Sequence, residues 1–198
     1  DVDYVLFTMM KKLSTYLFLI LFSFQTPSWA DDIQDFQIEG MSIGDSLLDY
    51  FSKEDLKNFS KDYYPKSKKY YQMTLNGDYN DFDNVTVKIK DNDKKYIIAS
   101  LFGSKYFPDN FSKCAKEKDE MIKFVSSFLK NNNGDTYEYE YPNNNGTAFI
   151  TDFDISGGAI RIWCVDWSKK AEEELNYTDN LSLSVTTNKI SQWINEAL

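Results

Sequence analysis

The longest regular pattern of apolar positions lies in residues 112–129. Its apolar side chains recur at the spacing of one helix face, at Cys114, Met121, Val125 and Phe128. Lys118 occupies the turn that this series leaves open. Because positions i, i+7, i+11 and i+14 of an α-helix lie on the same side, the pattern predicts an amphipathic helix with that side buried.

Alternation of apolar and polar residues predicts strands in most of the remaining chain. The predicted strands are residues 36–38, 70–75, 85–89, 96–102, 137–141, 148–155, 159–167 and 181–185. In the segment 96–102, Ile97, Ala99 and Leu101 are expected on one face, opposite Ile98. A turn is expected at residues 91–93, and Gly157-Gly158 is expected to form a two-residue turn before residue 159.

Short helices are predicted near both ends of this series. Either Ser42 or Asp45 is expected to cap a first helix containing Leu47, Leu48 and Phe51. Ser52 and Asp55 have the spacing of a capping box for a second helix. Residues 168–174 are expected to form a loop. A closing helix is predicted over residues 190–198, with one side formed by Ile190, Trp193, Ile194 and Ala197.

The order of these elements predicts an α+β fold. Runs of strands joined by hairpins, with helices between the runs, indicate antiparallel sheet with helices packed on one face. The helix-then-meander pattern occurs twice, in residues 31–108 and 109–198, which leaves open a fusion of two halves. No linker rich in proline or glycine separates them, and residues 31–198 are therefore predicted to form a single domain.

The two cysteines are expected to form a disulfide. Cys114 lies on the apolar side of the long helix, and Cys164 shares a strand face with Ile160 and Ile162. Both thiols thus point to the buried side of their elements. The loop that they close has about fifty residues, for which chain entropy gives about 4 kcal/mol of stabilisation. A redox-active role is disfavoured because the pair lacks the close C-x-x-C spacing.

The first thirty residues have the pattern of an export signal. Residues 1–8 precede Met9 and Met10 and are interpreted as upstream read-through. Lys11 and Lys12 then precede an apolar run over residues 13–24, and small residues stand at positions 28 and 30. This pattern predicts a secretory signal peptide cleaved after Ala30, and the apolar run is too short for a spanning helix. The expected location is periplasmic or secreted, with no membrane span after cleavage.

Composition narrows the classes of function. The formal net charge is −9, which repels nucleic-acid phosphates. The chain has no histidine, which removes the Ser-His-Asp and Cys-His mechanisms and histidine-ligated metals. The acidic stretch 76–84 suggests calcium, but an EF-hand loop from Asp78 would need glycine and glutamate where Asp83 and Ile89 stand. No cofactor and no metal site are predicted.

The motif Gly40-Met41-Ser42, before a short helix pair and a meander, resembles the helix-helix-strand units of small exported bacterial proteins. Examples are the β-lactamase inhibitor protein and the outer-membrane assembly lipoproteins. Those lipoproteins carry a cysteine at the cleavage point, where this chain has Asp31. The resemblance covers about sixty residues and implies a non-enzymatic module that binds a partner.

Two aspartates offer the main alternative to a binding function. Asp152 and Asp154 stand at i and i+2 of one predicted strand, so their carboxyls point to the same face. Paired carboxylates serve in glycoside hydrolysis, which makes a glycan hydrolase the runner-up. The same face lies opposite Phe149, Phe153 and Ile155, where solvated acids are expected in any case. Gly44-Asp45-Ser46 is similar to a lipase serine motif, but without histidine Ser46 is expected to start a helix.

An aromatic strand face is the preferred candidate site. Arg161, the only arginine, alternates with Trp163 and Trp167 opposite the cysteine face, and neighbouring strands are expected to bring Tyr137, Tyr139 and Tyr141 near them. Tryptophan, tyrosine and arginine dominate the energetics of protein interfaces. The competing account is that the closing helix covers this face through Trp193 and Ile194, which would make it core.

The sequence therefore predicts an exported, disulfide-stapled α+β protein that binds a protein or another envelope component and catalyses no reaction. The alternatives are the carboxylate hydrolase and a small-ligand carrier, which would need a closed apolar cavity.

Overall fold

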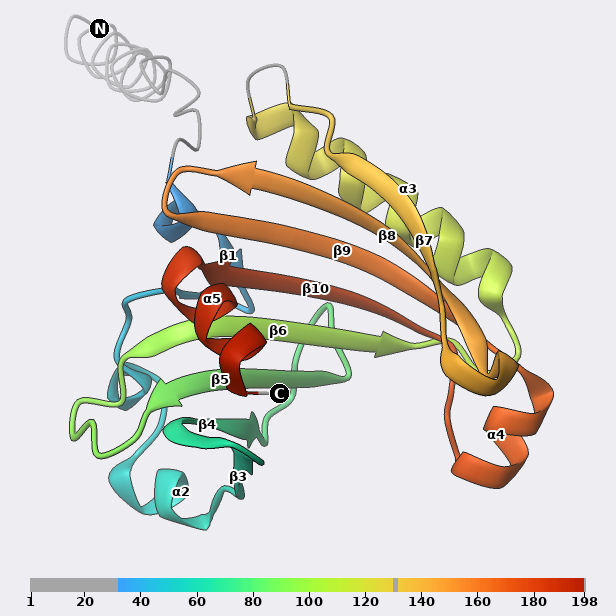
Figure 1. Ribbon diagram of the computed structural model, residues 1–198. Helices are drawn as coiled ribbons and strands as arrows, with labels where there is room; N and C mark the ends of the chain where they lie inside the picture. Colours follow the sequence, from blue (N-terminus) through green and yellow to red (C-terminus); the bar gives the residue numbers. More distant parts are fainter. Residues whose placement is uncertain (1–31, 130–131, 198) are drawn as a thin grey trace, which may run out of the picture.

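The computed structural model describes residues 32–129 and 132–197, and its main element is a large antiparallel sheet (Figure 1). The predicted signal peptide and its cleavage point lie outside the described residues. The strands of the sheet are β3 (Lys61–Tyr64), β4 (Ser67–Leu75), β5 (Asn84–Lys90), β6 (Ile98–Tyr106), β7 (Asp135–Glu140), β8 (Gly146–Ile155), β9 (Gly158–Trp167) and β10 (Asn180–Thr187).

Four helices and three 3-10 turns accompany the strands in the described part of the chain. The helices are α2 (Lys53–Asn58), α3 (Phe111–Phe128), α4 (Lys169–Leu175) and α5 (Asn188–Ala197). The 3-10 turns are η1 (Ile33–Asp35), η2 (Leu47–Asp49) and η3 (Pro142–Asn144). A separate hairpin pairs β1 (Gln37–Ile38) with β2 (Met41–Ser42).

The eight-stranded sheet consists of two meanders joined side by side. Its order is β3-β4-β5-β6-β10-β9-β8-β7, and every neighbouring pair is antiparallel. The last strands of the two meanders meet in the middle, where Val185 of β10 faces Leu101 of β6. The predicted α+β class with antiparallel sheet is thus confirmed, and one sheet spans both helix-plus-meander halves.

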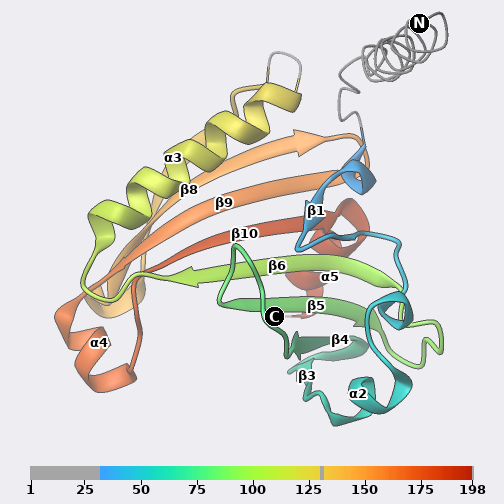
Figure 2. The same cartoon turned by 180° about the vertical axis from the view of Figure 1, so that it is seen from behind.

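Helix α3 covers one face of the sheet, lying across β9 and β10 (Figure 2). Side chains at every second strand position, among them Tyr71, Val87, Leu101 and Ile162, form the main core on this face. The predicted helix is confirmed within one residue at each end. Its apolar stripe is shorter than predicted, because Cys114 and Val125 are buried whereas Phe128 is exposed.

The closing helix α5 lies on the other face of the sheet (Figures 1 and 2). The predicted positions Ile190, Trp193 and Ala197 are buried there, against Tyr70 and with Ile194 beside them. The expectation that all helices share one face therefore needs correction for α5. Because β10 ends in Thr187 and the chain continues directly into the helix, α5 folds back over the face to which Tyr70 points.

The predicted disulfide is present and joins α3 to β9. The Cα atoms of Cys114 and Cys164 are 6.1 Å apart, within the usual range for a disulfide, and both residues are fully buried. The bond therefore connects the helix before the second meander to a strand inside it.

The segment around Ser52 agrees only in part with the prediction. The capping box is confirmed: the Ser52 hydroxyl accepts from the Asp55 amide, and the Asp55 carboxylate accepts from the Ser52 amide. The preceding helix is a single 3-10 turn, and its cap is Ser46 rather than Ser42 or Asp45. Asp45 instead accepts from the Ser42 amide at 2.8 Å, so its carboxylate closes the turn before the helix.

Three further local predictions are corrected. Ile98 joins Leu101 in the main core, because the register shifts at Lys88/Ile89 and an extra residue in β6 inverts the alternation. The turn before β9 is Ser156-Gly157, with Gly157 at φ +82°, and the segment predicted as a loop after Ser168 contains helix α4. Ser168 caps α4 by accepting from the Ala171 amide.

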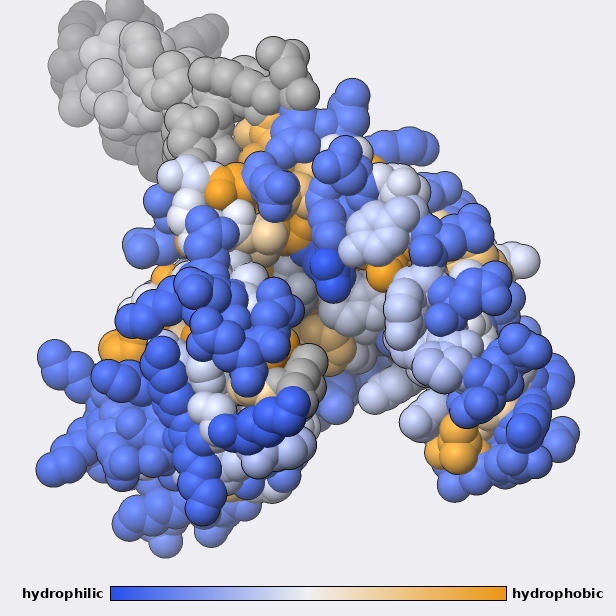
Figure 3. Space-filling view, in the orientation of Figure 1, coloured by the Kyte–Doolittle hydropathy of each residue, from blue (hydrophilic) through white to orange (hydrophobic). Residues whose placement is uncertain are grey.

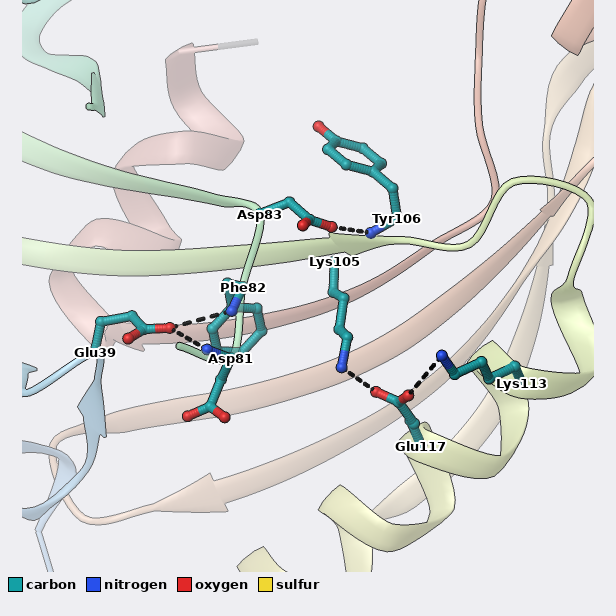
Figure 4. A network of polar contacts seen from close by, with 8 residues as sticks. All are labelled: Glu39, Asp81, Phe82, Asp83, Lys105, Tyr106, Lys113 and Glu117. Atoms are coloured by element: carbon teal, nitrogen blue, oxygen red, sulfur yellow. Dashed lines mark hydrogen bonds and ion pairs between the residues drawn. The ribbon is translucent and has the colours of Figure 1, made fainter. Parts of the chain in front are cut away.

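Glu39 fastens the small hairpin to the loop before β5 (Figure 4). Its carboxylate accepts hydrogen bonds from the amides of Asn80, Asp81 and Phe82 at 3.0, 2.8 and 3.1 Å. Figure 4 draws the bonds from Asp81 and Phe82. Partial burial opposes ionisation, but the three amide donors outweigh it and lower the pKa of Glu39. Backbone amides of the acidic stretch 76–84 thus donate to the Glu39 carboxylate, which holds this stretch in place.

Candidate functional site

The strongest candidate site is a groove on the α5 face of the sheet, with a volume of about 840 Å³. Its floor consists of side chains from β5, β6, β10, β9 and β8. One wall comes from β7 and the opposite wall from α5. In Figure 3 this face is hollowed between the side that carries α5 and the side that carries α4. We call this feature the sheet groove.

A polar cluster of three side chains lies at the β7 side of the sheet groove. Strand register places Arg161 of β9 opposite Asp152 of β8. The guanidinium donates to both carboxylate oxygens, at 2.7 Å from Nε and 2.8 Å from Nη2, and the Tyr137 hydroxyl donates to the same carboxylate at 2.9 Å. This bidentate arrangement holds Arg161 in one orientation while 47% of its side chain stays exposed.

Trp163 forms the apolar part of the groove floor. It is half-buried and stacks on Phe102 of β6, with 5.5 Å between ring centroids. The two strands are separated by β10, where Ser182 and Ser184 leave room for the rings to meet. An aromatic pair in this position offers a rigid contact surface that a bound group can cover with little loss of side-chain entropy.

A row of four aromatic side chains continues from the groove toward α4. Tyr139 contacts Tyr141, Tyr141 stacks on Trp167, and Trp167 stacks on Tyr177, with ring centroids 5.2, 4.5 and 4.5 Å apart. Tyr139 and Tyr141 line the groove, whereas Trp167 lies beyond it. The Trp167 amide donates to the buried carboxylate of Asp179 at 2.8 Å, which fixes the end of β9.

Helix α5 forms a wall of this site and leaves the two tryptophans of β9 half-exposed. Trp193 packs on Tyr64 and Tyr70, at 4.8 and 4.9 Å between ring centroids, and its indole donates to Ser67. Those contacts lie on β3 and β4, at one edge of the sheet, whereas Trp167 lies on β9 toward the other edge. Ile194 lines the groove from the helix side.

The sequence did not indicate the contribution of the first half to this site. Lys88 and Phe102 of the first half line the groove. Asn188, Ser191 and Asn195 of α5, in the second half, line it as well. Phe102 is an aromatic residue in phase with Ser100 and Ser104 on β6, which is a detectable signal. Its meaning depends on the pairing of β6 with β10, which local periodicity does not contain.

Both carboxylates of the pair line the groove, and that of Asp152 is already hydrogen-bonded. Both oxygens of Asp152 accept hydrogen bonds from Arg161 and Tyr137, whereas Asp154 is exposed. A hydrolytic acid needs an oxygen free to face the scissile bond. The arrangement therefore favours Asp152 as the residue that positions Arg161.

A second, more apolar hollow lies on the α3 face, with a volume of about 530 Å³. Its floor includes Ile160, Leu181 and Leu183, and its walls include Phe82 and Met121. The rim is charged: the Lys105 ammonium donates to Glu117 at 2.6 Å, and Lys113 lies 3.9 Å from the same carboxylate (Figure 4).

Within residues 32–129 and 132–197, no group of three or more acidic, histidine or cysteine side chains is placed to hold a metal ion. None of the helices in these ranges is long and apolar enough to cross a bilayer.

Comparison of the chain with protein-family models, with curated proteins and with solved structures finds no match.

Proposed function

We propose that this protein is an exported, non-enzymatic module that binds a partner protein in the sheet groove. The observation that carries the proposal is the preorganised Arg161 beside a half-exposed aromatic floor. A guanidinium held bidentately keeps its orientation in the free state, so a partner loses little entropy when it engages the exposed edge. Aromatic and arginine side chains gathered in one concave surface are typical of interface hot spots.

The disulfide supports the extracytoplasmic part of this proposal. Cys114 and Cys164 are bonded in the structure, and disulfides persist mainly in the periplasm and outside the cell. The resemblance of residues 40–42 and the segments after them to exported inhibitors and assembly factors points to the same class of function.

The proposal is tested by affinity capture from an envelope fraction, followed by measurement of Kd for the protein identified. Arg161→Ala and Tyr139→Ala should each raise Kd by about 30-fold, corresponding to a hot spot of about 2 kcal/mol. About half of each residue is exposed, 47% for the Arg161 side chain and 49% for Tyr139, so Tm should change little.

Matched controls come from the opposite face. Lys116→Ala removes an exposed cation of α3, and Phe124→Ala removes an aromatic ring that is 64% exposed. Neither should change Kd by more than about twofold, since surface substitutions outside the interface act within about 0.5 kcal/mol. If the α3 variants weaken binding and the groove variants do not, the groove is the wrong surface.

A second candidate function, carriage of a small apolar ligand, is favoured by the hollow on the α3 face. The hollow is open at a charged rim rather than closed, but its volume lies within the range of small-molecule sites. The neutral probe N-phenyl-1-naphthylamine should then bind with a micromolar Kd, and Leu183→Trp, which fills the hollow, should abolish that binding. Absence of probe binding to the unaltered protein would remove this candidate.

A further inference from the structure

Lys88 is a cation in the sheet groove that forms no salt bridge with the carboxylates of residues 32–129 and 132–197. It lines the groove from β5, next to Ser100 on β6 and Gln72 on β4. The side chains of α5 that line the same region are Asn188, Ser191, Ile194 and Asn195, all uncharged. Among the described residues Lys88 forms no ion pair, and its ammonium lies 6.0 Å from the centroid of the Tyr64 ring.

Burial makes this arrangement costly for the free protein. Desolvation lowers the pKa of Lys88, and no neighbouring carboxylate raises it again. A partly desolvated charge in a protein is normally paired with an opposite charge or neutralised. An unpaired one can instead be stabilised by a group from outside the chain. The other lysines of the sheet differ: Lys105 is paired with Glu117, and the remaining ones are exposed, namely Lys61, Lys68, Lys69 and Lys90.

The position of Lys88 relative to the aromatic floor sets the length of a bound segment. Lys88 is on β5 and Arg161 is on β9, three strand spacings away in the order β5-β6-β10-β9. At about 4.8 Å per spacing the separation across the strands is about 14 Å. An extended peptide covers this distance with four or five residues, at about 3.3 Å per residue.

We propose that Lys88 receives an aspartate or glutamate side chain of the partner protein, and that the bound segment crosses the strands from Lys88 to the aromatic floor around Trp163. This inference rests on the proposed function of the groove. It adds the chemistry of the partner, an acidic residue about four or five positions from the part that contacts Arg161 and the aromatic rings. An incoming carboxylate forms a charge-assisted hydrogen bond in a partly dry site, where such bonds are strongest.

Selection from a library of random twelve-residue peptides tests the proposal even while the partner is unidentified. The full chain with its disulfide is the bait, and peptides are kept when Tyr139→Ala weakens their binding. These peptides should carry an aspartate or glutamate at one preferred position, and replacing it with its amide should weaken binding at least tenfold. Lys88→Gln should cause the same loss, whereas Lys90→Gln, an equal change of charge on the same strand, should not.

Charge reversal gives the sharpest outcome. Lys88→Glu should select peptides with lysine or arginine at the same position. Peptides that depend on Tyr139, show no acidic preference and tolerate Lys88→Gln would overturn the role of Lys88 while leaving the groove function intact. Failure to obtain any peptide that depends on Tyr139 would contradict the groove function and this inference together. Binding of polygalacturonate that requires Lys88, with no acidic peptide selected, would assign the cation to a glycan and overturn the proposal.

Discussion

Glu39 shows how one side chain can hold two distant segments together. It lies in the turn of the β1–β2 hairpin at φ +51°, and its carboxylate accepts from three successive amides about forty residues later. The loop that it holds presents Phe82 to the main core. The hairpin and this loop are therefore expected to loosen together when the charge is removed.

Glu39→Gln should lower the free energy of unfolding by about 1 kcal/mol at pH 7, a discounted value for charge-assisted bonds at a hydrated site. The pKa of Glu39 is lowered in the folded state, so its stabilisation is present above the unfolded pKa and is lost as pH falls through the folded value. Urea unfolding at several pH values should thus show the difference between variant and parent shrinking below about pH 4. A difference independent of pH would contradict this account.

Lys88 has the opposite effect on folding. Its pKa is lowered by burial, so the charged form is disfavoured in the folded protein at neutral pH. Lys88→Met should therefore raise the free energy of unfolding by about 1 kcal/mol at pH 7. The cost in the parent protein is relieved as pH rises from the folded toward the unfolded pKa near 10, so the advantage of the variant should shrink there. Urea unfolding at pH 7 and pH 10 measures both, with Lys90→Met as the exposed control.

At the scale of elements, the disulfide is a covalent cross-link between α3 and strand β9 of the second meander. Its loop of 50 residues corresponds to about 4 kcal/mol in the chain-entropy estimate. Replacing both cysteines with alanine should lower the free energy of unfolding by roughly 2–5 kcal/mol. Urea unfolding measures the change, and a thiol count by mass spectrometry checks that the parent protein is oxidised. Two free thiols in protein isolated from the envelope, or a double variant as stable as the parent, would contradict the assignment.

The elements differ in how far the sequence predicts them. Helix α3 follows directly from periodicity, because Cys114, Lys118 and Val125 recur on its buried side. Strand β9 follows in the same way, because Ile160, Ile162 and Cys164 alternate on a fully buried face. Strand β3 does not, because it is an edge strand with three of its four residues exposed and carries no apolar alternation. Helix α4 resembles a loop in sequence because its charged residues conceal a single buried position, Ala171.

The sequence predicts only those residues of the candidate site that lie in the second half of the chain. Arg161, Trp163 and the three tyrosines are close in sequence, and hairpin pairing alone brings them together. Lys88 and Phe102 reach the site through the pairing of β6 with β10, strands about eighty residues apart. Such a pairing is decided by packing of the whole sheet, and short-range patterns do not specify it.

At the scale of the whole molecule, the two meanders create a surface that neither has alone. Joining β6 to β10 gives one continuous sheet, with α3 on one face and α5 at one end of the other. The area between α5 and β7 remains uncovered and forms the sheet groove. The first meander supplies Lys88 to this groove, and the second supplies Arg161 and most of the aromatic surface.

The measurement that tests the groove function most directly is hydroxyl-radical footprinting of the protein, free and bound to the partner identified by capture. If the partner binds in the sheet groove, oxidation of Tyr137, Tyr139 and Trp163 falls several-fold in the complex, while that of Phe124 on the opposite face stays unchanged. Protection of Phe124 with no change at the three groove residues would contradict the account and place the partner on the α3 face.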